Sequence, residues 1–359
     1  MGTIGFKAKE DICTNEAEYP TLITVLSLKF FGVFMFIKLL VIAILEFLYC
    51  PIVFATTEIP PISGKINRVI YITLDGVRWQ DVYQNHKHFP KFWEKHASKV
   101  IFYGDPLGNI PMYTASVPTS LPSYQSQMAG AVQSCADNNC GRIKVETLPE
   151  RIIRQLHLSK KEVVIFSSWP EIGYATEHVV GTTFSNNGKE FVYNPDNLKP
   201  DQVMNELNQK QGDDHPKGKN RYDRYTFAQA WHYFVTYEPL FLWISLDDAD
   251  EAAHADDLKA YHQALDYYDE VLDKILSYLQ TKKIEKQTLV IITTDHGRGD
   301  HSNWVNHGPE YPESKKIWAF VMNGQLVPVS QDEEKKRYSL LSIRPTIEKA
   351  LGMVDPVVN

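Results

Sequence analysis

The sequence predicts an α/β fold in which a mostly parallel central sheet carries helices on both faces. Five short runs are continuously apolar and rich in β-branched residues, as in strands that are buried on both faces. Between these runs lie segments whose apolar side chains recur at the three- and four-residue spacing of a helix. Strands that alternate with helices are typical of an open parallel sheet.

The expected strands follow from these apolar runs, and we place them at residues 68–75, 162–168, 240–248, 289–295 and 317–324. The clearest helix spans 256–280, where one stripe holds Leu258, Tyr261, Leu265, Tyr268, Leu272, Ile275 and Leu279. Further helices are expected at 146–156 and 340–352. The polar stretch 178–225 has no clear period, and we interpret it as an excursion that covers the sheet edge or a site.

Composition limits the class of protein. The chain has 359 residues, of which 43% are hydrophobic and 23% charged, so it can form one large α/β domain or two small ones. A net charge of −7 argues against nucleic acid as the main partner. The simplest organisation is a single domain at 68–353, preceded by a linker at 56–67.

The N-terminal segment differs from the rest of the chain, because residues 21–55 are almost wholly apolar. Read from Met35, the sequence has one lysine, an apolar core and small residues that end at Ala55, as in a signal peptide. We therefore interpret Met35 as the possible true start, with cleavage after Ala55. The alternative for the leader, 1–55, is an uncleaved membrane anchor. Either interpretation predicts export to the periplasm or the exterior, with membrane contact only through this segment.

Two cysteines follow the leader, Cys135 and Cys140, in the stretch SCADNNCG. They can close a small loop in an oxidising compartment. A zinc knuckle would need two more ligands of matching spacing nearby, and the sequence has none there. A disulfide is therefore the favoured interpretation.

Metal-type ligands occur where three expected strands end. Asp75 follows the first strand, Asp250 and His254 the third, and Asp295 and His296 the fourth. Binding groups gather beyond the carboxyl ends of strands in open α/β sheets. A lone aspartate there is usually a cap or turn residue. Several carboxylates in one crevice, however, repel each other unless a cation lies among them.

The types of these ligands indicate the metal. Asp250 and His254 are four residues apart, so a helical turn places them on one face. His307, in the stretch VNHG, is a further candidate ligand. Mixed imidazole and carboxylate ligands favour zinc, with manganese or iron as alternatives, over calcium, which takes oxygen ligands.

Ser120 is the candidate nucleophile. It precedes Leu121 and Pro122, and proline is favoured in the first turn of a helix, so Ser120 is expected at a helix N-terminus. The free backbone N–H groups and the dipole there favour an alkoxide or a phosphoryl group. The alternative is that Ser120 is simply a helix cap.

Together these motifs resemble those of the alkaline phosphatase superfamily, and specifically its type I phosphodiesterase and nucleotide pyrophosphatase branch. The resemblance runs from about residue 68 to residue 352 and rests on LDGVRW, TSLPSYQSQMAG, DADEAAH, TTDHGRG and NHG, in the family's order. It implies an alkaline-phosphatase-like fold with two divalent metal ions, expected to be zinc. One ion would be held by Asp250, His254 and His307, and the other by Asp75, Asp295 and His296.

The resemblance also assigns the groups that act on substrate. Ser120 would lie between the two ions as nucleophile and ligand, with Thr119 as the alternative. An asparagine about twenty residues later binds a phosphoryl oxygen in this branch, which points to Asn138 or Asn139. Independently of the resemblance, Trp169 lies near an expected strand end, where it would stack on a base or aromatic leaving group or simply pack in the core.

We therefore expect an exported, dinuclear hydrolase that cleaves phosphate esters through a phosphoseryl intermediate, with diesters favoured. Sulfatases of the superfamily carry an arginine where this chain has Tyr124, which argues against that activity. A phosphomonoesterase is an alternative, with Arg142 and Lys144 as its extra positive groups. The motifs are also compatible with a phosphoethanolamine-type transferase, which normally carries several membrane helices, and with an inactive metal-binding module, which would usually have lost a ligand.

Overall fold

The computed structural model describes residues 65–353, apart from 85, 109, 194–198, 217 and 330–336. The chain divides into two compact units, Met1–Pro60 and Pro61–Asn359, and the described residues all belong to the second. The predicted leader, 1–55, and most of the predicted linker, 56–67, lie outside the described residues.

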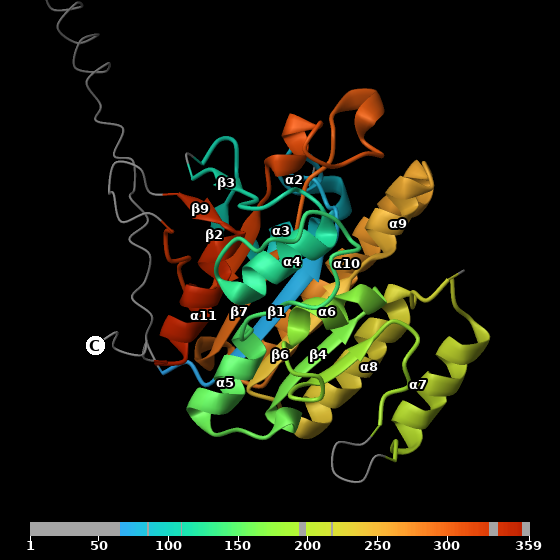
Figure 1. Cartoon of the computed structure of the whole chain (residues 1–359), viewed down its shortest axis with the longest axis vertical. Helices are drawn as coiled ribbons and strands as arrows, with labels where there is room; N and C mark the ends of the chain where they lie inside the picture. Colours follow the sequence, from blue (N-terminus) through green and yellow to red (C-terminus); the bar gives the residue numbers. More distant parts are fainter. Residues whose placement is uncertain are drawn as a thin grey trace, which may run out of the picture. The chain divides into compact units, whose positions relative to one another are not determined.

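A seven-stranded sheet forms the centre of the second unit (Figure 1). Its spatial order is β2-β8-β7-β1-β6-β4-β5, and the five strands from β7 to β5 are parallel. Strand β8 pairs antiparallel with both β7 and β2. A separate pair, β3 and β9, is parallel. The strands are β1 (Arg68–Leu74), β2 (Ile101–Tyr103), β3 (Met112–Tyr113), β4 (Val163–Ser167), β5 (Phe184–Asn187), β6 (Phe241–Leu246), β7 (Thr288–Thr293), β8 (Ala319–Met322) and β9 (Tyr338–Ser339).

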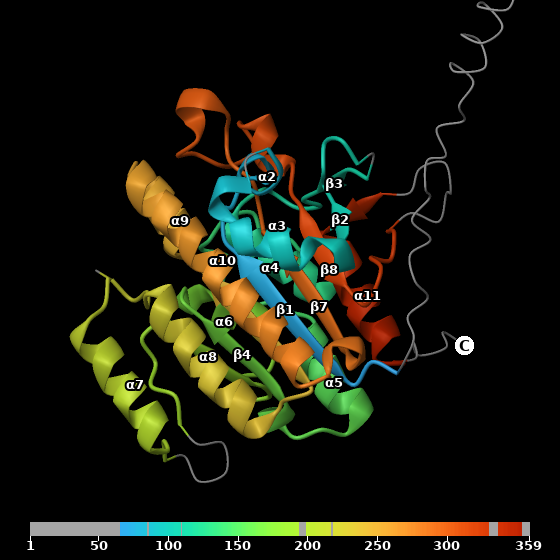
Figure 2. The same ribbon diagram turned by 180° about the vertical axis from the view of Figure 1, so that it is seen from behind.

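Helices cover both faces of this sheet, which confirms the predicted fold class. Figure 1 shows α4, α5 and α11 in front of the strands, and Figure 2 shows α10, α8 and α3 in front of the opposite face. Alternate residues of β1 enter two cores: Ile70 and Ile72 face one, Val69 and Tyr71 the other. The helices are α2 (Trp79–Tyr83), α3 (Pro90–Lys95), α4 (Ser120–Ala129), α5 (Leu148–Leu156), α6 (Gly173–Thr176), α7 (Gln202–Asp213), α8 (Asp223–Tyr237), α9 (Asp248–His254), α10 (Leu258–Thr281) and α11 (Ile343–Ala350).

Most predicted elements are present, with small shifts at their ends. The helix predicted at 256–280 is α10, whose first turn is capped by the Asp257 side chain, which accepts a hydrogen bond from the Ala260 N–H. Its apolar stripe is buried except for Leu258, which is 46% exposed. The strand predicted at 317–324 is β8, which departs from the parallel arrangement.

The stretch 178–225 is more regular than the sequence predicts. It contains the edge strand β5, the whole of α7 and the start of α8. The side chains that α7 buries are Met204, Asn208 and Gln211, so two of its three inward positions are polar. Asn208 exchanges hydrogen bonds with the backbone of Val192. Because polar contacts replace apolar ones here, the helix leaves no hydrophobic period in the sequence.

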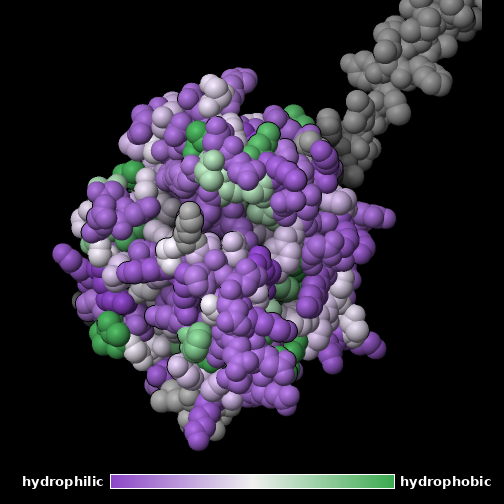
Figure 3. Space-filling model, turned by 90° about the vertical axis from the view of Figure 1, so that its right-hand side faces the viewer, coloured by the Kyte–Doolittle hydropathy of each residue, from purple (hydrophilic) through white to green (hydrophobic). Residues whose placement is uncertain are grey.

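The surface in Figure 3 is dominated by hydrophilic side chains, and hydrophobic residues occur there in small separate groups. Among the described residues, none of the helices combines the length and the apolar character that crossing a bilayer requires.

Candidate metal centre

The carboxyl ends of three adjacent strands bring the predicted ligands together. Strand β1 lies between β7 and β6, and each of the three is followed by an acidic residue. Asp75 follows β1, Asp250 lies in the first turn of α9 after β6, and Asp295 follows β7. Since the three strands are parallel, these carboxylates lie at the same edge of the sheet.

Asp250, His254 and His307 form the first ligand group, as the resemblance implies. His254 Nε2 lies 3.0 Å from Asp250 Oδ2 and 3.2 Å from His307 Nε2. The other ring nitrogen of His307, Nδ1, lies 3.0 Å from the Pro118 carbonyl oxygen. A proton on Nδ1 can donate to that carbonyl and leaves Nε2 as the free ligand atom.

Asp75, Asp250 and His296 form a second group, so Asp250 is shared by both. His296 Nε2 lies 3.5 Å from Asp75 Oδ1 and 3.4 Å from Asp295 Oδ2. The His296 ring stacks on the His307 ring at a centroid distance of 3.9 Å, which joins the two groups. The structure thus gathers all six predicted ligands, with Asp250 nearer to the second group than the resemblance implies.

Each of the three carboxylates has one oxygen engaged by another group of the chain. The Tyr124 hydroxyl donates to Asp75 Oδ2 at 2.9 Å, and the Gly76 N–H donates to Asp295 Oδ1 at 3.1 Å. The Arg298 guanidinium donates to Asp250 Oδ1. In contrast, Asp75 Oδ1 and Asp295 Oδ2 are buried and have no hydrogen-bond partner among the residues that the structure describes. Buried carboxylate oxygens without a partner are costly unless a cation binds them, so the residues present fit a metal site.

The electrostatics of the centre also favour a cation. Burial, together with the nearby charges of Asp295 and Asp247, raises the pKa of Asp75 well above its ordinary value. Burial raises the pKa of Asp295 to about 6. Burial also lowers the pKa of His296 to about 3 and, with the charges of His296 and Arg298, that of His307 to about 2. The imidazoles are therefore neutral at pH 7 and can act as ligands.

Ser120 is the first residue of α4, with Thr119 as the N-cap. Its side-chain oxygen lies 3.3 Å from His296 Nε2, and the residue is 5% exposed. The Thr119 side chain makes no cap hydrogen bond. The geometry therefore favours Ser120 over Thr119 as the hydroxyl next to the ligands, at a helix end that attracts anions.

The predicted substrate contacts fall in different places. The Leu121 N–H, in the first turn of α4, donates to Asn138 Oδ1 at 3.0 Å, so Asn138 lies beside Ser120. Asn139 is exposed and its backbone N–H bonds to Asp137. Trp169 is partly buried and packs against the core beneath α4, α5 and α11. Among the described residues, only Asn138 of these three has a hydrogen bond to the helix that carries Ser120.

Cys135 and Cys140 form a disulfide, as the sequence predicts. The bond closes the loop that contains Asn138. Gln125 of α4 donates from Nε2 to the carbonyl of Gly141, directly after this loop, at 2.6 Å. The loop is therefore held to α4 at a residue inside it, Asn138, and at the residue directly after it, Gly141.

Arg298 is the contact that sequence reasoning missed. Its side chain is fully buried and bonds to Asp250, to the Gly76 carbonyl and to the Val305 carbonyl. Its position in TTDHGRG, two residues after His296, was the available signal. Gly76 is constrained by the same cluster, because its φ is +62° and a Cβ there would lie 2.4 Å from Asp250 Oδ1.

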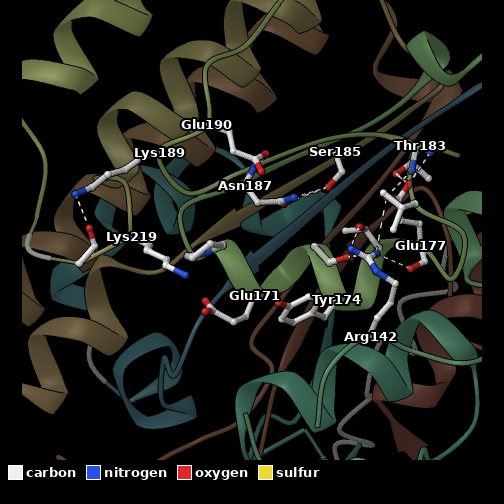
Figure 4. A pocket seen from close by; sticks show the side chains of 16 residues that line it. Arg142, Glu171, Tyr174, Glu177, Thr183, Ser185, Asn187, Lys189, Glu190 and Lys219 are labelled. Atoms are coloured by element: carbon white, nitrogen blue, oxygen red, sulfur yellow. Dashed lines mark hydrogen bonds and ion pairs between the residues drawn. The ribbon is translucent and has the colours of Figure 1, made fainter. Parts of the chain in front are cut away.

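A cavity with a volume of about 730 Å³ lies beside α6 and β5 (Figure 4). None of the six ligands lines it. Arg142, a candidate phosphate-binding group, lies in its wall, where it donates to the carbonyls of Gly173 and Glu177. Lys144 is exposed. These contacts hold Arg142 in the wall of a cavity that none of the six candidate ligands lines.

Comparison with known proteins shows that part of the chain is similar to a family of metal-dependent enzymes. Residues 215–354, which include all of the six ligands except Asp75, match the family model described as the Metalloenzyme superfamily. No curated protein matches the chain in sequence.

Solved structures share the fold. A 2-O GAG sulfatase is 15% identical with a TM-score of 0.53, and the match covers 82% of this chain and 72% of that one. The phosphonate monoester hydrolase of Agrobacterium radiobacter is 15% identical with a TM-score of 0.51, over 80% and 74% of the two chains. The lipooligosaccharide phosphoethanolamine transferase A of Neisseria meningitidis is 11% identical with a TM-score of 0.50, over 81% and 55%.

Residues 215–354 are thus similar to the Metalloenzyme superfamily, and the solved structures show that the fold is shared over most of the chain. The family match and the shared fold confirm the resemblance to the alkaline phosphatase superfamily.

Proposed function

We propose that the protein is an exported, dinuclear metal-dependent hydrolase that cleaves phosphate diesters through a phosphoseryl intermediate on Ser120. The observation that carries the proposal is the position of the Ser120 hydroxyl, 3.3 Å from His296 Nε2 at the N-terminus of α4 and among six clustered ligands. Two divalent ions, which we propose to be zinc, would lower the pKa of that hydroxyl and neutralise charge on the phosphoryl group.

The chain's own residues support both halves of the reaction. Ser120 Oγ attacks phosphorus, the Oγ–P bond forms and the bond to the leaving oxygen breaks. Water then cleaves the Oγ–P bond and restores the serine. Asn138 Oδ1 is held by the Leu121 N–H, and its Nδ2 has no partner among the described residues, so Nδ2 can donate to a phosphoryl oxygen. His254 is half-exposed, so the first ligand group opens to solvent.

Diesters are favoured because a monoester carries an additional negative charge, and two candidate basic side chains, Arg298 and Arg142, are bonded to other groups of the chain. Arg298 is bonded to Asp250 and to backbone carbonyls, and Arg142 to the carbonyls of Gly173 and Glu177. Tyr124 occupies the place of the sulfatase arginine, which argues against sulfate esters. Export is proposed from the apolar leader and is consistent with the disulfide.

The test is an assay of the purified full-length chain, stripped of metal and then reloaded with zinc. The substrates are bis-p-nitrophenyl phosphate, p-nitrophenyl phosphate and p-nitrophenyl sulfate. We expect zinc-dependent turnover that is fastest for the diester, and a loss on the order of 10³-fold or more for Ser120→Ala. Thr119→Ala is the matched control and should stay active. Faster cleavage of the sulfate, or equal turnover by Ser120→Ala, would overturn the proposal.

A further inference from the structure

Tyr124 joins the helix of the nucleophile to a metal ligand. It lies on α4, four residues after Ser120, so the two are one helical turn apart. Its side chain is fully buried, and its ring packs against Trp243 with centroids 5.8 Å apart. Its hydroxyl donates to Asp75 Oδ2 at 2.9 Å. The ring is thus fixed by packing, and the hydroxyl by a carboxylate of the site.

The two oxygens of Asp75 therefore have separate environments. Oδ2 accepts from Tyr124, whereas Oδ1 is buried, has no hydrogen-bond partner in the described part of the chain and lies 3.5 Å from His296 Nε2. Only one oxygen of Asp75 is directed at the other ligands. Outer contacts of this kind orient a metal ligand and restrict how many of its atoms can bind.

We propose that Tyr124 is a positioning residue that makes Asp75 a one-oxygen ligand and keeps that ligand in register with Ser120. The inference rests on the proposed function for its catalytic consequence, although its effect on metal binding does not. Of the three donors that engage the clustered carboxylates, Gly76 and Arg298 belong to loops after β1 and β7. Tyr124 alone belongs to the helix that carries the nucleophile.

The side chain at position 124 also determines the charge next to Asp75. An arginine there would place a cation next to Asp75, whereas the phenol supplies a neutral donor of fixed reach. A neutral donor leaves the negative charge of Asp75 available to a metal ion. Removal of the hydroxyl would leave Oδ2 buried without a partner, and the carboxylate could then turn so that both oxygens face the centre.

Tyr124→Phe tests the inference, because it deletes one hydroxyl and preserves the ring. In the full-length chain we expect zinc affinity, measured by chelator competition, to fall about 10- to 100-fold. The visible absorption of the cobalt-loaded protein should change, since ligand geometry changes. With bis-p-nitrophenyl phosphate, kcat should fall by a similar factor while KM stays within about threefold.

Tyr233→Phe is the matched control, because Tyr233 is also fully buried and its hydroxyl donates to the Lys161 carbonyl at 2.9 Å. It should keep the zinc affinity and cobalt spectrum of the wild type. Tyr124→Phe in an Asp75→Ala background completes a double-mutant cycle. The substitution should cause no further loss of zinc affinity in that background, because Tyr124 acts through Asp75.

Wild-type affinity and spectrum in folded Tyr124→Phe would overturn the inference, and so would an undiminished loss in the Asp75→Ala background. If Tyr124→Phe does not fold, 3-fluorotyrosine at position 124 keeps the shape of the side chain and makes its hydroxyl a more acidic donor. The cobalt spectrum should then shift, and an unchanged spectrum would count against Tyr124. The metal measurements use no substrate, so they decide the inference even if the phosphodiesterase proposal fails.

Discussion

Arg298 and Asp250 form an ion pair in which the arginine side chain is fully buried and the carboxylate nearly so. The guanidinium also donates to the carbonyls of Gly76 and Val305, which are close in sequence to the candidate ligands Asp75 and His307. One side chain thereby ties together the loop after β1, helix α9 and the loop that carries His307. We infer that Arg298 organises the centre and is distinct from the ligands themselves.

Arg298→Lys should weaken metal binding although it keeps the charge. An ammonium group cannot reproduce the planar set of bonds to one carboxylate and two carbonyls. We expect zinc affinity to fall about 10- to 100-fold and the melting temperature of the metal-free protein to drop. Chelator competition and thermal melts provide the measurements. Arg154→Lys, in an exposed pair with Glu146, should leave both unchanged. Unaltered zinc affinity in Arg298→Lys would contradict this role.

Asp295→Asn should stabilise the metal-free protein at neutral pH while it impairs metal binding. Burial raises the folded-state pKa of Asp295 from 3.8 to about 6. The folded state therefore holds this proton more tightly than the unfolded state, and that contribution is complete below pH 3.8 and lost as pH rises through 6. Asp295→Asn has no carboxyl proton to lose, so at pH 7 the free energy of unfolding of the metal-free variant should exceed that of the wild type by about 1–3 kcal/mol.

Urea denaturation in a chelator between pH 4 and 8 measures this difference. The advantage of Asp295→Asn should shrink below pH 6 and vanish near pH 4. Asp300→Asn, at an exposed position of the same loop, is the control and should show no such trend. Added zinc should stabilise the wild type more than Asp295→Asn. If Asp295→Asn is less stable than the wild type at every pH, the charge of Asp295 does not destabilise the metal-free protein and the prediction is wrong.

Asn138→Ala should impair turnover without loss of metal, because Asn138 contacts the nucleophile helix but is not a ligand. A lost hydrogen bond to a charged phosphoryl oxygen predicts a fall in kcat/KM of about 10- to 100-fold. Metal content can be measured on the same samples. Asn139→Ala is the neighbouring control, since that residue is exposed, and its activity should be normal. The reverse ranking of the two variants would reassign the phosphoryl contact.

The strands and the ligands could be predicted because local sequence carries both signals. Continuous apolar runs identify buried strands, and polar residues directly after them must lie at the carboxyl edge of a parallel sheet. Asp75 and Asp295 follow from this rule, whereas Asp250, four residues beyond β6, was singled out by its four-residue spacing from His254. His307 was a candidate by residue type, but its place in the group with Asp250 and His254 needed the resemblance, since its approach to His254 depends on the path of a long loop.

The supporting contacts could not be predicted, because they depend on tertiary packing. No local pattern indicates that Tyr124 reaches Asp75 or that Arg298 reaches Asp250, since each pair joins segments far apart in the chain. Helix α7 escaped prediction for another reason. Its buried face holds Asn208 and Gln211, and a search for periodic apolar residues does not detect side chains that are buried through hydrogen bonds.

The disulfide between Cys135 and Cys140 encloses the segment that presents Asn138 to the nucleophile helix. None of the candidate metal ligands lies in that segment, so the proposed metal centre and the proposed phosphoryl contact are held in place by different bonds. A chain folded under reducing conditions would still bring its ligands together but would leave Asn138 on an open loop. Full catalytic activity would then require oxidation of the two cysteines, and the thiol–disulfide balance would set the active fraction of the metal-loaded protein.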